Sequence, residues 1–420
     1  MKLLVLGGAG DMGSYTVRDV AQYGSVFDEI IIGDINERRS KKLIKELGDK
    51  RISFKKVNAH DHESLVNVMQ ESDVIVSAIG PFYIFGPKVV KAAIAAKKPI
   101  IDICDDYGPT QEVLRMDEEA KNAEVLVLLG YGWTPGLSNL LVRYGYNKLD
   151  KDDKIRVNIA WAGGAADSEG LAVIMHVLYA VDGKIPSHIN GKLVDVLAGE
   201  GHQKVEFPEP LGTIGVFDTG HPEPVTIPKF LEGIEECTLK GGLTPNWNNQ
   251  FASSMKQLHL IQGRRRKTVL AKIVHFIEGL FAAGGVPASS VRVDLFGSLD
   301  GKPAHLVYAT PSITMGELTG IPASIAAEFV AKGKITGTGV KPPETIEDPT
   351  IFFEELKKRG IKMVFDDKGT PEMFQPPKPY KLGFVSRYGL TFLIVIICLA
   401  ILLGIIWILW LIWNFVPNSL

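Results

Sequence analysis

Short apolar runs alternate with amphipathic stretches along the first third of the chain. The runs are four to six residues long and end at polar or glycine-rich turns, as buried strands do. The stretches between them repeat apolar residues every three or four positions, which is typical of helices. The predicted strands are 3–6, 29–33, 52–57, 73–77, 99–103 and 125–129, and the predicted helices between them include 87–96 and 110–122. This alternation predicts an α/β fold built on a doubly wound parallel sheet.

The pattern changes near residue 131. Sheet-like stretches separated by turns are predicted at 155–161, 204–207, 213–217, 224–227 and 291–296, and helices at 170–181, 268–281, 319–332 and 350–359. A chain of 420 residues is long for one domain. We therefore expect a first domain over 1–130 and an α+β second domain over 131–330.

The C-terminal end has a different composition. Residues 371–388 are rich in proline, which favours an extended tether. Residues 389–416 contain no charged residue, and a helix of that length would cross the apolar layer of a bilayer. Lys378, Lys381 and Arg387 precede this segment, so the positive-inside rule places the large N-terminal part in the cytoplasm. We predict a single-pass membrane protein that is anchored in the lipid bilayer through 389–416.

A glycine-rich turn follows the first strand directly. Gly8, Gly10 and Gly13 match the G-x-G-x-x-G fingerprint of Rossmann-type dinucleotide-binding units, and Asp11 and Met12 stand between the last two. We assign the tight turn to Gly8, the close approach to a pyrophosphate to Gly10, and the close packing of helix on strand to Gly13. The N–H groups that begin the next helix would bind the pyrophosphate.

The second predicted strand leads into Asp34, which stands 21 residues after Gly13 (34 − 13). An acid at this place holds the ribose hydroxyls of NAD and repels the 2′-phosphate of NADP. Arg38 and Arg39 follow closely and could bind that phosphate. The sequence therefore indicates NAD or NADP as the cofactor, with NAD slightly favoured.

Small residues follow the fourth predicted strand. Ligands of doubly wound sheets bind beyond the carboxyl ends of the strands. Ala78, Gly80 and Pro81 stand at such an end, beside the expected position of the nicotinamide half of the cofactor. Their size would let the cofactor approach the backbone closely.

Carboxylates and one histidine are the candidates for acid–base chemistry. Asp102, Asp105 and Asp106 surround the end of the fifth strand, where they either position an amine or cofactor hydroxyls or cap the next helix. In the second domain, His221 precedes Glu223 by two residues in a proline-rich loop. This pair could bind substrate or move a proton, although a histidine in a loop can also be structural.

Composition narrows the classes of function. The chain has 46 basic and 48 acidic residues, so it gives no reason to expect nucleic-acid binding. Its three scattered cysteines argue against a disulfide framework or a cysteine metal site. His60-x-His62 is too sparse a pattern for a metal centre. We therefore expect no metal.

Two other patterns are interpreted as structural. Tyr144-x-x-x-Lys148 imitates the dyad of short-chain dehydrogenases, but it follows the sixth strand, and the nearby Ser138 does not have that family's spacing. Arg264–Lys267 begins an apolar-rich helix that could lie on an anionic membrane face. We favour a core or dimer helix with a solvated basic start.

The chain resembles the saccharopine dehydrogenase family over about residues 1–365. The resemblance is carried by Val5–Gly13, Ala78–Pro81, Ile101–Cys104, Gly132–Asn139, Gly220–Thr226, Thr319–Pro322, Gly339–Glu344 and Glu355–Gly360. It implies an NAD(P)-linked oxidoreductase that acts on the C–N bond of a small, amino-acid-derived amine. It also implies that 331–370 returns to the first domain and that the protein is a homodimer.

The resemblance also implies roles for the candidate residues. Asp105, His221 and Glu223 are the expected catalytic residues, which would take the amine proton and assist hydrolysis of the imine. Tyr131 and Trp133 are expected to bind the substrate by shaping its pocket. Two other functions stay open. One is a membrane-associated NAD(P)-dependent reductase of a lipid C=C or C=O bond, and the other is a membrane protein that binds NAD(P) without turnover.

Overall fold

The computed structural model describes residues 1–167, 170–257, 264–277 and 284–368. Contacts within the chain divide it into Met1–Pro376 and Pro377–Leu420, and the second unit lies outside the described residues. The predicted tether 371–388 and the predicted membrane helix 389–416 also lie outside them. Within the described ranges, none of the helices has both the length and the apolar character needed to cross a membrane.

The first sheet has seven parallel strands in the order β15-β6-β5-β4-β1-β2-β3. They are β1 (Lys2–Leu6), β2 (Glu29–Asp34), β3 (Ile52–Lys56), β4 (Val74–Ser77), β5 (Ile100–Asp102), β6 (Leu126–Leu128) and β15 (Gly339–Lys341). The six strands that the apolar runs predict are confirmed. The sequence pattern does not predict β15, because a strand of three residues is too short to show a period.

Helices cover this sheet on both sides, as expected for a doubly wound fold. They are α1 (Asp11–Tyr23), α2 (Glu37–Leu47), α3 (His62–Gln70), α4 (Phe82–Ala96), α5 (Tyr107–Leu114) and α6 (Asp117–Asn122). The prediction of one helix over 110–122 is wrong, because the chain breaks between α5 and α6 near Met116. Asp117, Glu118 and Glu119 then begin a new helix, where acidic residues are favoured by the helix dipole.

The second sheet is mixed and follows the order β10-β11-β12-β7-β13-β14-β16, with β8 beside β12 and β9 beside β8. Its strands are β7 (Ile155–Gly164), β8 (Lys184–Ile189), β9 (Lys192–Leu197), β10 (Gln203–Phe207), β11 (Gly212–Asp218), β12 (Ile234–Thr244), β13 (Ser289–Leu299), β14 (Lys302–Ala309) and β16 (Val364–Asp366). The remaining helices are α7 (Leu137–Lys148), α8 (Leu171–Ala180), α9 (Glu223–Phe230), α10 (Trp247–Gln257), α11 (Arg264–Phe276), α13 (Met315–Ala331) and α14 (Thr350–Lys358). Of these, α13 packs against α1, β4 and β5 of the first sheet, and α14 packs against α13.

One predicted strand is wrong. Residues 224–227 were expected in a sheet because Val225, Thr226 and Ile227 favour strands. They lie in helix α9, whose first turn contains Glu223 and Pro224. Proline and an acid both suit the first turn of a helix, where no intrahelical N–H bond is lost and the dipole attracts negative charge. These start signals outweigh the β-branched run.

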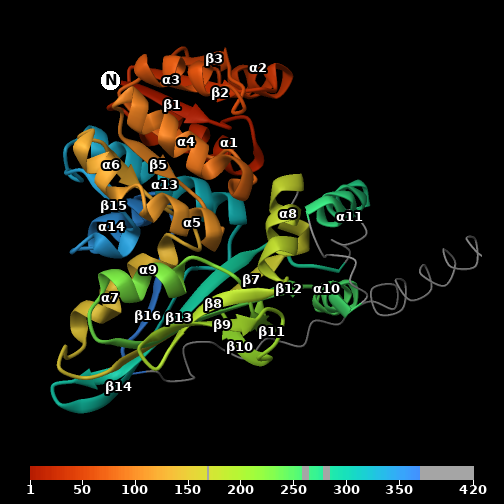
Figure 1. The fold of residues 1–420 in the computed structure, drawn as a ribbon, viewed down its shortest axis with the longest axis vertical. Helices are drawn as coiled ribbons and strands as arrows, with labels where there is room; N and C mark the ends of the chain where they lie inside the picture. The colour runs from red at the N-terminus through yellow and green to blue at the C-terminus, as the bar shows by residue number, and fades with distance from the viewer. Residues whose placement is uncertain (168–169, 258–263, 278–283, 369–420) are drawn as a thin grey trace, which may run out of the picture. The chain divides into compact units, whose positions relative to one another are not determined.

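Helix α13 returns from the C-terminal part of the chain to pack beside α1 (Figure 1). The two backbones approach closely at Gly320, where a Cβ atom would lie 2.8 Å from the backbone nitrogen of Thr16. The hydroxyl of Thr16 donates a hydrogen bond of 3.0 Å to the carbonyl of Gly320. A glycine is therefore required at this helix–helix contact.

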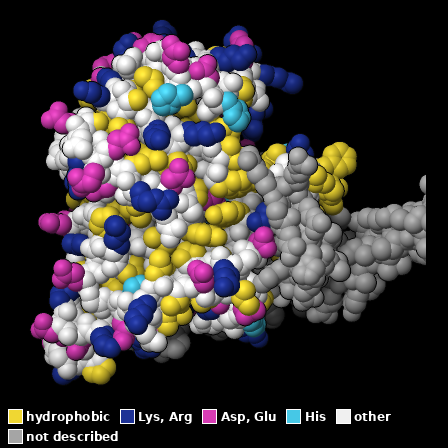
Figure 2. Space-filling view, in the orientation of Figure 1, with side chains coloured by type: hydrophobic (Ala, Val, Ile, Leu, Met, Phe, Trp, Pro, Cys, Tyr) yellow, Lys and Arg dark blue, Asp and Glu magenta, His cyan; other side chains and the backbone are white. Residues whose placement is uncertain are grey.

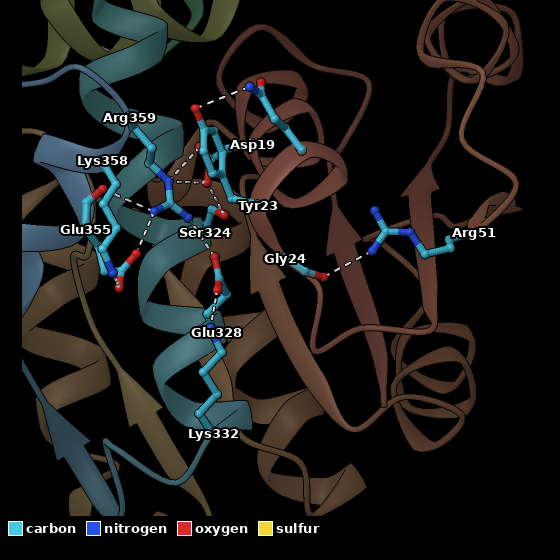
Figure 3. Close-up of polar contacts among 11 residues, drawn as sticks. Asp19, Tyr23, Gly24, Arg51, Ser324, Glu328, Lys332, Glu355, Lys358 and Arg359 are labelled. Carbon is cyan, nitrogen blue, oxygen red and sulfur yellow. Dashed lines mark hydrogen bonds and ion pairs between the residues drawn. The ribbon is translucent and has the colours of Figure 1, made fainter.

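A buried charge network joins α1, α13 and the end of α14 (Figure 3). The guanidinium of Arg359 donates to Asp19 at 2.8 Å, to Glu328 at 2.7 Å and to Glu355 at 3.0 Å. Ser324 donates a further hydrogen bond of 2.6 Å to Asp19. Buried charges are tolerated when each is paired in this way, so the network holds the C-terminal helices against the first sheet's helices.

The visible surface carries charges of both signs. Figure 2 shows basic and acidic side chains interspersed over one face of the molecule, which agrees with a formal net charge of −2. Such a mixed surface provides no extended single-sign field for a polyelectrolyte.

Candidate functional site

A cavity of about 420 Å³ lies between the two sheets. On one side it is bordered by the loops that follow β1, β2, β3, β4 and β5, and on the other by α8, α13 and the second sheet. In the first sheet, β1 lies between β2 and β4, so the direction of the strand order reverses there. Ligands of doubly wound sheets bind at this reversal point.

The glycine loop forms one wall of the cavity. Gly7, with φ +70°, begins the turn after β1 in the left-handed conformation, and a Cβ on Gly8 would lie 2.9 Å from the carbonyl oxygen of Val5, so the tight turn requires both glycines. A Cβ on Gly13 would lie 2.3 Å from the carbonyl oxygen of Gly7, which confirms close packing of helix on turn. Gly10 borders the cavity, whereas Gly8 and Gly13 lie behind its surface.

Helix α1 presents an uncapped N-terminus to the cavity. Gly10 occupies the N-cap position and has no side chain to accept from the first turn. Asp11 and Met12 follow and border the cavity. Because the first N–H groups of a helix have no acceptor inside it, they are available to an anion. These residues fit the pyrophosphate of a dinucleotide.

Asp34 lies at the end of β2 and borders the same cavity. Its carboxylate accepts hydrogen bonds from the backbone N–H groups of Ala9, at 3.1 Å, and Asn36, at 2.8 Å. It therefore holds the glycine loop in place and remains at the cavity wall. Arg38 is exposed and does not border the cavity, while Arg39 forms an ion pair of 2.8 Å with Asp11.

The loop after β4 forms the next part of the wall. Ala78, Gly80 and Pro81 all border the cavity, as their position at a strand end predicts. A Cβ on Gly7 would lie 2.8 Å from the carbonyl oxygen of Ala78, so the two loops touch. His60, which follows β3, also borders the cavity and packs its ring against Phe85 at 4.9 Å.

The three carboxylates after β5 have different surroundings. Asp102 is buried and accepts hydrogen bonds from the N–H groups of Cys104 and Gly130, so it links the ends of β5 and β6. Asp105 and Asp106 border the cavity. Asp106 accepts from the backbone N–H of Tyr83 at 3.0 Å. The cluster is thus divided between a structural carboxylate and two carboxylates at the cavity.

His176, on helix α8, contacts both Asp105 and Asp106. Its Nδ1 lies 2.9 Å from Oδ1 of Asp106 and 3.3 Å from Oδ1 of Asp105. Burial alone would lower the pKa of this imidazole, but Asp105 and the hydrogen bond to Asp106 raise it to about 9. Burial raises the pKa of Asp105 to about 7, although the charge on His176 opposes the rise. At neutral pH, His176 is therefore positively charged and lies beside Asp105, which titrates near pH 7.

His221 borders the cavity opposite this group. Its ring is buried and packs edge-on against His176, with centroids 5.1 Å apart. Neither ring nitrogen has a hydrogen-bond partner among the described residues. Burial and the charge on His176 hold its pKa well below the usual range, so the imidazole is neutral. A buried, neutral and unpartnered imidazole at a cavity wall is available to a ligand.

Glu223 lies behind His221 and does not border the cavity. Its Oε1 accepts hydrogen bonds from Thr134 at 2.5 Å and Ser138 at 2.7 Å, and its Oε2 lies 3.8 Å from Nδ1 of His221. Burial raises the pKa of this carboxyl group, and the two hydroxyl hydrogen bonds offset part of the rise. Glu223 is therefore bound to Thr134 and Ser138, behind the cavity wall.

Aromatic residues complete the wall. Trp133 borders the cavity and packs edge-on against Trp161, with centroids 6.2 Å apart. Trp161 also borders the cavity, and a Cβ on Gly241 would lie 2.2 Å from its ring. Tyr131 is buried against Phe352 and does not border the cavity. Trp133, Asp105, Asp106, His176 and His221 are called here the reacting end of the cavity.

His176 and Trp161 were not candidates from the sequence. His176 is the histidine of an otherwise apolar helix, and a polar residue within such a pattern was the signal available. Trp161 lies on the predicted strand 155–161, at the last position. His176 and Trp161 lie at the cavity wall because α8 and β7 pack against the loops of the first sheet. A local sequence pattern does not predict such packing.

One group of side chains has the spacing of cation ligands. Asp105, Asp106 and His176 each offer an atom, and these atoms lie within 4.8 Å of one another. The nitrogen concerned is Nδ1 of His176, which is already hydrogen-bonded to Asp106. Both carboxylates are already paired with the imidazole, and a metal would have to displace the proton of His176. The arrangement therefore fits an ion pair better than a metal centre.

The patterns interpreted as structural lie away from the cavity. Lys148 pairs with Asp367 at 2.7 Å and lies over the ring of Tyr144, and neither residue of this dyad borders the cavity. Helix α11 packs on α8, while Val269, Ile273 and Phe276 are exposed. The side chains of Arg264–Arg266 lie outside the described residues.

Comparisons with known proteins agree with this geometry. Residues 3–128 match the family model for the saccharopine dehydrogenase NADP-binding domain. Isoflavone reductase homolog P3 from Arabidopsis thaliana is 29% identical over 124 residues, which cover 29% of this chain and 40% of that protein. Saccharopine dehydrogenase (L-Glu forming) from Saccharomyces cerevisiae superposes with a TM-score of 0.61 and 16% identity, over 87% of this chain and 99% of that one. Residues 3–128 are therefore an NAD(P)-binding domain of the saccharopine dehydrogenase type, and the chain shares that enzyme's fold.

Proposed function

We propose that this protein is an NAD(P)-dependent oxidoreductase that acts on the C–N bond of an amine. The observation that carries the proposal is the continuity of one cavity. The cavity runs from Gly10 and Asp34, in the NAD(P)-binding domain, to Asp105, His176 and His221. A cofactor site and a group of acid–base residues thus share one cavity, as hydride transfer coupled to proton transfer requires.

The cofactor would be held by the first domain. The uncapped start of α1 would bind the pyrophosphate, and Asp34 would bind the ribose hydroxyls. Ala78, Gly80 and Pro81 would lie beside the nicotinamide half. When bound in its oxidised form, the cofactor accepts the hydride that leaves the carbon next to the substrate nitrogen.

Asp105 is the proposed proton acceptor. Oxidation of a secondary amine to an imine removes a hydride from carbon and a proton from nitrogen, and one water then hydrolyses the imine to a carbonyl compound and a primary amine. An acid with a pKa of about 7 is well suited to take up and release that proton near neutral pH. Asp105 borders the cavity, so a bound amine can reach its carboxylate.

His176 and His221 support this proton transfer in different ways. His176, held by Asp106, keeps a positive charge beside Asp105 and so limits the rise in the pKa of that acid. His221 is neutral and offers a free ring nitrogen to the substrate or to the attacking water. Glu223 lies behind the cavity wall, with Oε2 3.8 Å from Nδ1 of His221.

The test is a cofactor-dependent screen of the purified full-length protein. Lysine, saccharopine, carboxy-polyamines and simple secondary amines would be incubated with NAD⁺ or NADP⁺, and formation of the reduced cofactor would be followed by absorbance. We expect turnover of at least one amine and its loss in Asp105→Asn. Binding of NAD(P) without turnover of any amine would favour the non-catalytic alternative.

We also propose that residues 389–416 anchor the protein in a membrane, with the N-terminal part on the cytoplasmic side. The support is the uncharged sequence of this segment and the basic residues before it. Expression of the full chain and of 1–376 would be compared by alkaline extraction of membranes, and we expect only the full chain to stay in the pellet. Turnover restricted to a lipid presented in bilayers would instead favour reduction of a lipid C=C or C=O bond.

A further inference from the structure

The ionisable groups at the reacting end of the cavity do not balance in charge. When Asp105 is ionised, it and Asp106 share the single positive charge of His176. His221 adds no charge, because its pKa is far below the usual range. The group therefore carries one excess negative charge, next to a cavity that could receive a ligand. A cationic ligand would compensate it, and an anionic ligand would be repelled.

The aromatic residues of the cavity wall also favour a cationic ligand. Trp133 and Trp161 both border the cavity, and their rings meet at an interplanar angle of 68°. The faces of indole rings attract ammonium groups, most strongly where water is excluded. Both rings are buried, with exposed fractions of 6%. Within the described part of the chain, their indole N–H groups have no hydrogen-bond partner, and they would suit an uncharged acceptor such as a carbonyl oxygen.

Apolar side chains surround this charged group. Helix α8 contributes Ala172, Val173 and Val177 to the cavity wall, and Leu243 and Met315 lie on the other side. These side chains would contact hydrocarbon on the substrate and would leave a second charged group without a partner. The cavity wall therefore suits a ligand that has one positive charge and is otherwise apolar.

From these observations we infer the substrate class: an amine that is cationic at the reacting nitrogen, has hydrocarbon on both sides, and bears no carboxylate on the carbons attached to that nitrogen. The inference rests on the proposed function and narrows it. A carboxylate in that place would face Asp105 and Asp106 across the cavity, where like charges are weakly screened. The substrate therefore differs from an amino acid whose reacting nitrogen stands beside its own carboxylate.

The test compares amines with their carboxylated analogues. Dibutylamine would be paired with N-butylnorvaline, and piperidine with piperidine-2-carboxylate, so that each pair differs by a single carboxylate. Their dissociation constants would be measured by calorimetry on the full-length protein saturated with NADP⁺. We expect each amine to bind at least about tenfold tighter than its analogue, which corresponds to about 1.4 kcal/mol.

Two variants test whether Asp105 causes the preference for amines over their carboxylated analogues. Asp105→Asn should reduce the preference for the amines, whereas Glu112→Gln, which removes an exposed carboxylate from α5 outside the cavity, should keep it. The affinity for NADP⁺, which the first domain determines, reports whether each variant is folded. If Asp105→Asn does not fold, the preference of the unmodified protein within each pair still decides the inference.

Failure of the inference and failure of the proposed function give different results. Equal or tighter binding of the carboxylated analogues, or no binding of either class, would overturn the substrate class. Preferential turnover of N-butylnorvaline would also overturn the substrate class, but it would support the oxidoreductase function. Tight, Asp105-dependent binding of the amines without any reduction of NAD⁺ or NADP⁺ would support the ligand class and count against the reaction.

Discussion

Nδ1 of His176 lies 2.9 Å from Oδ1 of Asp106, although the two residues are 70 positions apart in the chain. The contact joins helix α8 to the loop after β5, so it places the second domain's histidine at the carboxyl edge of the first sheet. The same nitrogen lies 3.3 Å from Asp105. One imidazole therefore lowers the pKa of the carboxylate that we propose as the proton acceptor, against the rise that burial causes.

The pH dependence of catalysis should report this relationship. Asp105 must be ionised to accept a proton, so kcat/KM for amine oxidation should rise with pH through about 7. The raised pKa of His176 means that its charge is present below about 9 and is lost above it, so activity should fall there. In His176→Gln, loss of the positive charge should move the lower limb to higher pH. An unchanged lower limb would show that His176 does not act on Asp105.

His221 and Glu223 should differ in importance. His221 borders the cavity, so His221→Ala should lower kcat by about 10²-fold or more, the usual contribution of one acid–base group. Glu223→Gln keeps an oxygen that can accept from Thr134 and Ser138, so its cost should resemble one hydrogen bond, about 0.5–1.5 kcal/mol. Steady-state kinetics of both variants measures the difference. A larger loss in Glu223→Gln than in His221→Ala would reverse our assignment.

Asp34 should govern the choice between NAD and NADP. Its carboxylate remains at the cavity wall, where it would repel a 2′-phosphate. In Asp34→Ser, the ratio of NADP⁺ to NAD⁺ affinity should rise by about tenfold, equivalent to about 1.4 kcal/mol. Glu37→Gln on α2, an exposed acid that does not border the cavity, is the matched control. Titration with each cofactor provides the ratio, and an unchanged ratio in Asp34→Ser would contradict a role at the ribose.

Arg359 should be essential for stability. Its side chain is 2% exposed, and its removal would leave Asp19 and Glu328 buried without their main cationic partner. Arg359→Met should lower the free energy of unfolding by about 3–5 kcal/mol. Lys358→Met, next to it but exposed, should change this free energy by about 1 kcal/mol or less. Urea denaturation of both variants provides the comparison, and similar losses in the two would show that the buried network contributes little.

Chelation should leave the activity unchanged. The possible cation ligands Asp105, Asp106 and His176 are paired with one another. Treatment with EDTA followed by gel filtration, with kcat measured before and after, tests this expectation. A loss of activity that Zn²⁺ or Mn²⁺ restored would assign a metal to these three side chains.

Much of the NAD(P)-binding domain was predictable from the sequence, because its signals are local. Six apolar runs predict six strands of the first sheet, and the spacing from the glycine loop to Asp34 predicts the cofactor site. The sequence assigns the tight turn to Gly8, where a Cβ would lie 2.9 Å from the carbonyl oxygen of Val5. Gly7 lies outside the G-x-G-x-x-G pattern, and only the backbone path shows that it shares the turn with a positive φ.

The remainder depends on contacts between distant segments. Strand β15 is recognisable only by its pairing with β6, and helix α9 replaces a predicted strand because its start signals prevail over its β-branched residues. His176 is part of the site because α8 packs against the loop after β5. Tyr131 does not border the cavity because it packs on Phe352. The sequence alone thus determined the cofactor domain, because periodicity and turn chemistry act over a few residues. Tertiary structure decided the reacting end, because burial and charge pairing there join residues that are far apart in the chain.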